Sequence, residues 1–124
     1  MKAVIIIAAG SGLGGMARYG LQLLAYRLYP IRFPLGTFLV NLIGCFLIGL
    51  FFSLAEKAGA INQEIKLFLI TGFCGGFTTF STFSVDALSL LRAGEITYFI
   101  LYTAGSVIAG MLMTWLGMQV IKAG

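Results

Sequence analysis

The chain contains no histidine and only two cysteines and four acidic residues among its 124 residues. Without histidine, neither imidazole metal ligation nor histidine-based acid–base catalysis is available. Both cysteines, Cys45 and Cys74, lie inside apolar runs, so we interpret them as buried small side chains and expect no disulfide framework. The absence of these groups predicts that the chain is not an enzyme.

Charge is also sparse, because only 10% of the residues are charged and the net charge is +4. The eight basic residues are scattered singly, which argues against nucleic acid as a partner and favours anchoring at lipid headgroups. Apolar residues are abundant, at 60% of the chain with a mean hydropathy of +1.03. A soluble domain of this size could not keep so much apolar surface from water. The composition therefore predicts a membrane protein.

Long runs without formal charge predict four membrane-spanning helices within a single domain, residues 1–124. A spanning helix needs about 20 mostly apolar residues. The segments that meet this length are residues 3–28, 35–54, 65–91 and 96–121. The start of the chain also resembles a secretory signal, but its apolar character continues to Tyr26, which favours a retained helix.

Basic residues are divided almost evenly between the two ends of the predicted helices. One end carries Lys2, Lys57, Lys66 and Lys122, and the other carries Arg27, Arg32 and Arg92. Since orientation normally follows an excess of Lys and Arg in cytoplasmic loops, a chain with hardly any excess could insert both ways round. We therefore expect two inverted copies to pair as an antiparallel homodimer about an axis in the membrane plane.

The third apolar segment contains "TGFCGGFTTFSTF" and is predicted to be broken in mid-membrane, because Gly72, Gly75 and Gly76 weaken a helix there. Unwound backbone at this depth is tolerated only where it is buried in protein or lines a cavity, and its freed carbonyls can hold a cation. The carbonyls of Gly75 and Thr78 are the candidate ligands for an alkali ion. A glycine kink sealed by threonine side chains explains the same residues equally well.

Two further positions combine apolar surroundings with groups that could contact an anion. Phe80 and Phe83 share one helix face after the break, and the positive edge of a phenyl ring can contact an anion, although ordinary aromatic packing is the commoner explanation. Asn41 lies deep in the second predicted helix, where its amide could serve an anion or an interhelical hydrogen bond. Thr37 lies one turn earlier on the same face and is a further candidate pore residue.

Polar and small residues also recur every four positions along the fourth predicted helix. They are Tyr98, Tyr102, Ser106, Gly110 and Thr114. This stripe could line a track of hydroxyl donors, which Thr82 of the third helix would join, or it could pack helices together. Arg18 is the one charge inside the first span, and it could extend to the interface or concentrate an anion at a pore vestibule.

These motifs resemble the Fluc (CrcB) family of small fluoride channels over nearly the whole chain. The stretches that carry the resemblance are "GGMARY", "GTFLVNLIGCFLIG" and "GFCGGFTTFSTF". The resemblance implies an all-α membrane protein that forms a dual-topology, antiparallel homodimer with two fluoride pores and a central structural sodium ion. It also implies passive export of fluoride across the bacterial cytoplasmic (inner) membrane, with fluoride, lipid and a second copy as partners.

The resemblance further assigns functions to individual positions. It implies pore-lining functions for Asn41, Phe80 and Phe83, sodium-binding carbonyls at Gly75 and Thr78, and a polar track of Thr82, Tyr102, Ser106 and Thr114. Gly110 falls on that track without offering a hydroxyl. Such a pore would replace the water shell of fluoride with amide and hydroxyl donors and positive ring edges.

Two alternatives stay open beside the channel. A small multidrug-resistance-type cation transporter is also short and four-spanning, but its mechanism needs a carboxylate within the membrane, and the first predicted span has none. A non-transporting membrane assembly subunit would use the polar stripes for packing alone.

Overall fold

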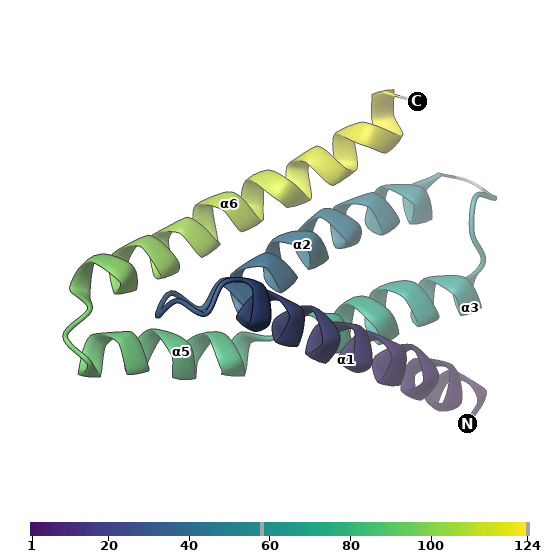
Figure 1. Cartoon of the computed structure of the whole chain (residues 1–124). Helices are drawn as coiled ribbons and strands as arrows, with labels where there is room; N and C mark the ends of the chain where they lie inside the picture. Colours follow the sequence, from purple (N-terminus) through teal and green to yellow (C-terminus); the bar gives the residue numbers. More distant parts are fainter. Residues whose placement is uncertain (58, 124) are drawn as a thin grey trace.

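The computed structural model describes residues 1–57 and 59–123 and is almost entirely helical (Figure 1). Its elements are α1 (Lys2–Leu28), α2 (Leu35–Glu56), α3 (Gln63–Lys66), the π-helix η1 (Leu67–Cys74), α4 (Gly75–Phe77), α5 (Phe80–Arg92) and α6 (Ile96–Ala123). Segments α3, η1, α4 and α5 follow one another as the third span. Among the described residues, four segments are long and apolar enough to cross a membrane, which confirms the four predicted spans.

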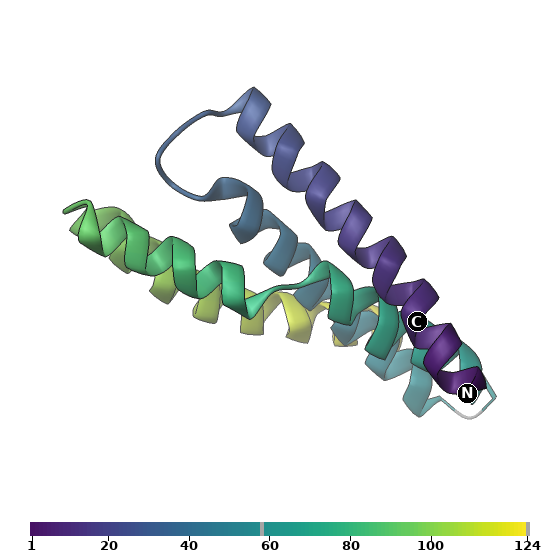
Figure 2. The ribbon, with the colours of Figure 1, turned by 90° about the horizontal axis from the view of Figure 1, so that it is seen from below.

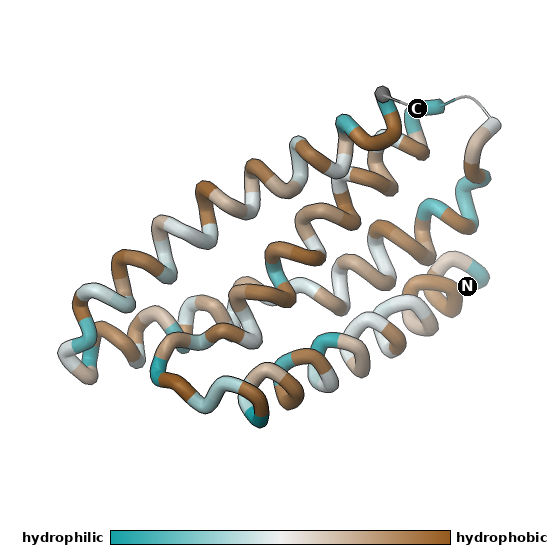
Figure 3. The backbone as a smooth tube through the Cα atoms, turned by 45° about the horizontal axis from the view of Figure 1, so that its top comes forward, coloured by the Kyte–Doolittle hydropathy of each residue, from teal (hydrophilic) through white to brown (hydrophobic). Residues whose placement is uncertain are grey.

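The polar ends of these spans lie at two opposite ends of the bundle. The N-terminus, the connection between α2 and α3, and the C-terminal end of α6 lie at one end (Figure 1). The α1–α2 loop and the α5–α6 turn lie at the other end. Hydrophilic segments gather at these two ends, while hydrophobic residues cover most of the helix lengths (Figure 3). This is the arrangement expected of a chain that crosses an apolar layer repeatedly.

Helices α2 and α6 pack side by side because glycines let their backbones approach closely. A Cβ added at Gly49 would collide with the carbonyl of Thr114, and one added at Gly117 would collide with the carbonyl of Phe46. Lipid tails are as apolar as the helices, so close backbone packing, rather than burial from water, holds such helices together. The glycines are therefore structural at this contact.

Helix α1 packs in the same way against η1 and α4. A Cβ at Gly10 would lie 3.0 Å from the Cα of Gly72, and one at Gly14 would lie 2.9 Å from the amide nitrogen of Phe77. The Ser11 hydroxyl donates to the Gly72 carbonyl at 3.4 Å across this contact. Beyond it, α1 diverges from α5, so the two halves of the third span have different neighbours (Figure 2).

The third span is broken as predicted, but the break does not lie at the glycines. Gly75 and Gly76 are helical, whereas Thr78 (φ −84°, ψ 159°) and Thr79 (φ −152°, ψ 123°) are extended. A Cβ at Gly76 would lie 2.9 Å from the Cα of Ser11, so this glycine serves the close approach of α1. Packing against α1 thus outweighs the weak helix propensity of Gly76, and the two threonines interrupt the helix.

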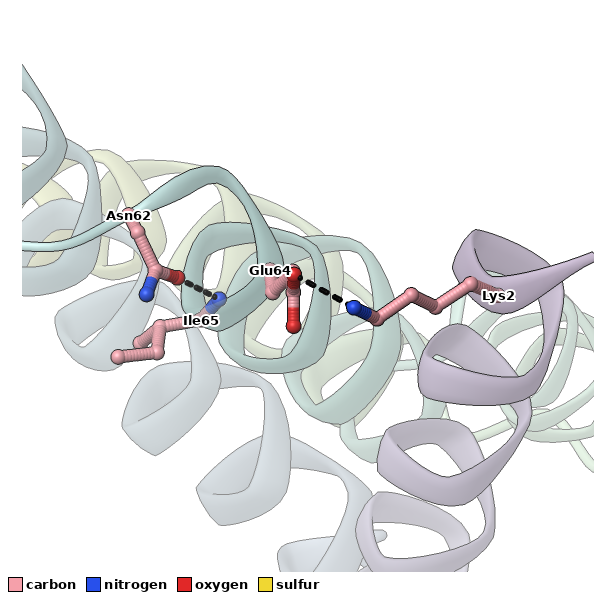
Figure 4. A network of polar contacts seen from close by, with 4 residues as sticks. All are labelled: Lys2, Asn62, Glu64 and Ile65. Carbon is pink, nitrogen blue, oxygen red and sulfur yellow. Dashed lines mark hydrogen bonds and ion pairs between the residues drawn. The ribbon is translucent and has the colours of Figure 1, made fainter.

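Polar contacts hold the start of the third span against α1 (Figure 4). The ammonium of Lys2 lies 3.0 Å from the carboxylate of Glu64, and the Asn62 side chain accepts a hydrogen bond of 2.8 Å from the backbone N–H of Ile65. Exposed ion pairs contribute about 0 to 1 kcal/mol, and an Asn cap contributes about 1 kcal/mol. These contacts therefore fix the position of α3 more than they stabilise the bundle.

At the opposite end, an aromatic cluster holds the α1–α2 loop between α2, α5 and α6. The ring of Phe33 in the loop packs edge-on against Tyr102 of α6, with centroids 5.5 Å apart, and against Phe38 of α2 at 5.6 Å. Tyr102 has no exposed surface and also packs against Phe83 of α5 at 5.0 Å. This cluster fixes α5 relative to α6 just beyond the break.

Candidate functional site

The break faces a pocket of about 420 Å³, which we call the break pocket. Residues of α2, η1, α4, α5 and α6 line it together with the two extended threonines. The predicted site residues that meet there are Asn41, Gly75, Thr78, Phe80, Phe83 and Ser106. Residues far apart in the sequence therefore converge on one space beside the broken helix.

Asn41 of α2 pairs with the extended backbone of the break. Its Nδ2 donates to the carbonyl of Thr79 at 3.1 Å, and its Oδ1 accepts from the backbone N–H of Thr79 at 2.9 Å. The side-chain amide thus takes the place of the two backbone partners that a helix would supply. A side-chain amide carries two N–H donors, so one hydrogen of Nδ2 is left over after these bonds. The interhelical hydrogen bond expected as one alternative is present.

The threonines satisfy the two helix ends that the break creates. The Thr78 hydroxyl donates to the carbonyl of Cys74 at 2.9 Å, which closes the end of α4. The Thr79 hydroxyl accepts from the backbone N–H of Thr82 at 3.2 Å and so caps the start of α5. Such an N-cap is worth about 0.5 to 2 kcal/mol. Short hydroxyl side chains therefore explain why the break follows the glycines.

The same hydrogen bonds divert two backbone N–H groups from the carbonyls that they would serve in a continuous helix. In an α-helix the carbonyl of residue i accepts from the N–H of residue i+4. The N–H that would serve Gly75 belongs to Thr79 and goes to Asn41, and the N–H that would serve Thr78 belongs to Thr82 and goes to the Thr79 hydroxyl. These are the two carbonyls predicted as cation ligands, and neutral oxygens are ligands that hard cations accept. The residues present fit a small hard cation.

The side chains that commonly bind metal ions do not cluster in the part of the chain that the structure describes. In the described part of the chain, no group of three or more His, Cys, Asp and Glu residues is arranged to hold a metal ion. The candidate cation ligands at the break, the carbonyls of Gly75 and Thr78, are backbone groups. The neighbouring Gly76 carbonyl is already occupied, since Arg18 donates to it from Nε at 3.2 Å.

Three aromatic rings extend from the surface of the chain to its interior beside the break. Phe80 is 77% exposed, and its ring centroid lies 5.7 Å from that of Phe83. Phe83 in turn lies 5.0 Å from the buried ring of Tyr102. Phe80 and Gly75 are both exposed and both line the break pocket, so this pocket opens to the outside of a single copy.

The polar residues of the α6 stripe have different surroundings in the structure. Ser106 lines the break pocket, and its Oγ is buried without a hydrogen-bond partner among the described residues. Tyr102 donates to Asp86 at 3.4 Å. The Thr114 hydroxyl donates to the carbonyl of Gly110 in its own helix at 3.1 Å. Ser106 is thus the stripe residue that lines the break pocket and whose buried hydroxyl has no partner among the described residues.

Thr37 and Thr82 line a second pocket of about 230 Å³, which we call the loop pocket because residues of the α1–α2 loop border it. Asp86 also lines it. Tyr102 contacts both sites, since it packs against Phe83 of the break pocket and donates to Asp86 of the loop pocket. The predicted track is therefore separated into two polar spaces with Tyr102 in contact with each.

Arg18 and Thr114 are not among the residues that line either pocket. Arg18 is half-buried and binds the Gly76 carbonyl, so its side chain is held at the broken span. Its positive charge therefore lies beside the Gly76 carbonyl of α4. Both predicted functions of Arg18, extension to the interface and concentration of an anion at a pore vestibule, stay predictions.

Gln22 of α1 is a further polar residue at the loop pocket, and it is absent from the sequence motifs above. Its Nε2 donates to the Thr37 hydroxyl at 3.1 Å, and it lines the loop pocket. The sequence feature that could have identified it is its spacing. Gly14, Arg18 and Gln22 follow at four-residue intervals, on the face that α1 turns toward the bundle. A glutamine on that face needs a polar partner inside the bundle.

The fold and the site together define a multi-pass helical membrane protein with a polar break in its third span. Residues 5–118 match the family described as CrcB-like protein, Camphor Resistance (CrcB), and the chain belongs to this family.

Several relatives are similar over nearly their whole length, and each is named fluoride-specific ion channel FluC. The one from Flavobacterium psychrophilum is 44% identical over 122 residues, which cover 98% of each chain. The one from Phocaeicola vulgatus is 47% identical over 94% of this chain and 96% of its own. The one from Chlorobium phaeobacteroides is 45% identical over 97% of this chain and 93% of its own.

Proposed function

We propose that the chain forms a fluoride-selective, passive ion channel that exports fluoride across the bacterial cytoplasmic membrane. The relatives that bear the name of such a channel match this chain from end to end, which favours transport over catalysis. The observation that carries the proposal is the break pocket. It gathers an unused amide hydrogen of Asn41, the unpartnered hydroxyl of Ser106 and the rings of Phe80 and Phe83 around one space.

This set of groups suits an anion that is small and strongly hydrated. A channel must offer an ion enough contacts to replace its water shell, yet bind it weakly enough to release it. The Asn41 amide and the Ser106 hydroxyl supply hydrogen-bond donors, and the phenyl edges supply positive partial charge without a proton to lose. None of these groups carries a formal charge, so the anion would not be trapped by a fixed ion pair.

We also propose that the channel is an antiparallel homodimer with two pores. In a single copy the break pocket is open, and Phe80 and Gly75 at its edge are exposed. An inverted second copy would cover this side and present the same residues in return, as two-fold symmetry requires. The even division of Lys and Arg between the two ends supports insertion in both orientations. Topology reporters fused to the C-terminus should then be active on both sides of the membrane, and activity on one side alone would contradict it.

A structural sodium ion would fit the carbonyls of Gly75 and Thr78. The support for this proposal is that the N–H groups which normally occupy these oxygens are diverted to side chains. When bound, such an ion supplies positive potential beside a path for anions. The protein's own contribution is to hold the carbonyls in place through the Asn41 pairing and the Thr79 cap.

Fluoride efflux from liposomes tests the proposed function. Purified protein is reconstituted into liposomes loaded with potassium fluoride, and the external fluoride is followed with an electrode after valinomycin is added. We expect rapid fluoride efflux, and no chloride efflux from liposomes loaded with potassium chloride. Fluoride release equal to that of empty liposomes would overturn the channel. Proton-driven uptake of cationic dyes would indicate the multidrug-type transporter, and no transport of any kind would indicate an assembly subunit.

A further inference from the structure

We propose that Gln22 is a positioning residue, which holds the Thr37 hydroxyl as a hydrogen-bond donor toward the loop pocket. This inference rests on the proposed function, because it treats the loop pocket as part of the fluoride path. Gln22 itself acts on the anion only through Thr37. The residue lies on α1, which contributes no lining residue to the break pocket.

The contact between α1 and α2 fixes Gln22 in place. A Cβ added at Gly36 would lie 2.9 Å from the Cα of Gln22, so the two backbones approach closely at the first turn of α2. Nε2 of Gln22 donates to the Thr37 hydroxyl at 3.1 Å across this contact. Thr37 is 5% exposed, so its side chain is shielded from other partners outside the bundle.

The direction of this hydrogen bond determines what Thr37 can do. A hydroxyl has one hydrogen to donate and two lone pairs to accept, whereas an amide nitrogen only donates. The Thr37 oxygen is therefore the acceptor from Gln22, and its own hydrogen stays available for another group. If the glutamine presented its carbonyl oxygen instead, the hydroxyl would turn toward α1 and be used up there.

Three other threonines use their hydroxyl hydrogens within their own stretch of chain. Thr78, Thr103 and Thr114 each donate to the backbone carbonyl four residues earlier. In the described part of the chain, Thr37 has no such bond to its own helix. Its hydroxyl lines the loop pocket, where it donates a hydrogen bond to the side chain of Asp86. The hydrogen of Thr37 is therefore directed into a pocket that Thr82 also lines, and Gln22 holds it in that direction.

A double-mutant cycle on fluoride efflux tests this assignment. Gln22→Met keeps the length of the side chain but cannot hydrogen-bond, Thr37→Val removes the hydroxyl, and Leu24→Met is a matched control on the exposed face of α1. We expect Gln22→Met to slow efflux by about two- to tenfold, the range that the net contribution of one hydrogen bond gives. In the Thr37→Val background, Gln22→Met should cause no further loss, and Leu24→Met should conduct as the unmodified chain does.

A second variant keeps the test decisive if Gln22→Met folds poorly. Gln22→Glu has nearly the same shape but offers only acceptors when ionised, so it should draw the Thr37 hydrogen toward α1 and slow efflux while the melting temperature stays close to that of the unmodified chain. Wild-type efflux in either Gln22 variant, or equal losses with and without Thr37, would overturn the inference. An unmodified chain that conducts no fluoride would overturn the proposed function, and this inference with it.

Discussion

Replacing Asn41 with leucine should destabilise the folded protein, because one side chain satisfies both polar groups of the Thr79 backbone. Asn41→Leu keeps a similar volume but removes the bonds of 3.1 Å and 2.9 Å at once. An unsatisfied buried backbone group costs about 1 to 3 kcal/mol, whereas hydrogen bonds within membrane bundles contribute about 0.6 kcal/mol on average. We expect a total loss of about 1 to 4 kcal/mol from these two estimates.

The loss can be measured by titrating protein in mixed detergent micelles with sodium dodecyl sulfate and following helicity by circular dichroism. Ile43→Leu is the matched control, because it lies two residues away on the exposed side of α2. Asn41→Asp separates the two bonds, since a carboxylate can accept from the Thr79 N–H but cannot donate to its carbonyl. This variant should also weaken anion passage by placing negative charge at the break pocket. If Asn41→Leu is as stable as Ile43→Leu, the side chain does not hold the break, and the reasoning is refuted.

Three further predictions follow from the contacts of single residues. Gly117→Ala should lower stability by about 1 to 3 kcal/mol in thermal unfolding, because its Cβ would collide with the Phe46 carbonyl, whereas Gly12→Ala, with no atom within 4 Å, should not lower it. Thr79→Val should cost about 0.5 to 2 kcal/mol through loss of the α5 cap, and Thr79→Ser should restore it; equal stability of both variants would contradict the cap. Ser106→Ala should slow fluoride efflux without loss of stability, because the buried hydroxyl has no partner among the described residues, and unchanged efflux would remove Ser106 from the path.

The four spans could be predicted because a membrane-spanning helix needs a long apolar run, which is visible in the sequence. The predicted first span, residues 3–28, corresponds to α1 (Lys2–Leu28), and the second, 35–54, corresponds to α2 (Leu35–Glu56). Each apolar run has to be helical at this depth, since only intrahelical bonds satisfy its backbone. Helix α2 continues for two more residues, to the charged Glu56, where hydropathy gives no signal.

The position of the break was less predictable, because helix propensity and packing act in opposite directions at Gly76. From the sequence, this glycine weakens a helix, but in the structure it lets α1 approach and stays helical. Which of the two effects wins depends on the neighbour, Ser11, which lies 65 positions away in the sequence. The sequence predicted threonine side chains that seal a glycine kink, and the structure places the extended residues at Thr78 and Thr79 themselves.

The sequence predicted which residues belong to the candidate site better than it predicted the groups that these residues contact. Asn41 is at the pocket, but its pairing with the Thr79 backbone could not be inferred, since it depends on how α2 meets the third span. Thr37 shares a helix face with Asn41 yet lines a different pocket. Gln22 went unnoticed because a single glutamine near a helix end is also typical of an interface residue.

The central claim is that fluoride passes through the break pocket, and filling this pocket tests it most directly. Val107 of α6 lines the pocket, whereas the neighbouring Ile108 is 69% exposed and is not among its lining residues. Fluoride efflux is measured from liposomes that contain either Val107→Trp or Ile108→Trp, with folding confirmed by circular dichroism. We expect Val107→Trp to abolish efflux and Ile108→Trp to conduct like the unmodified protein. Full efflux through Val107→Trp would show that fluoride does not pass through the break pocket.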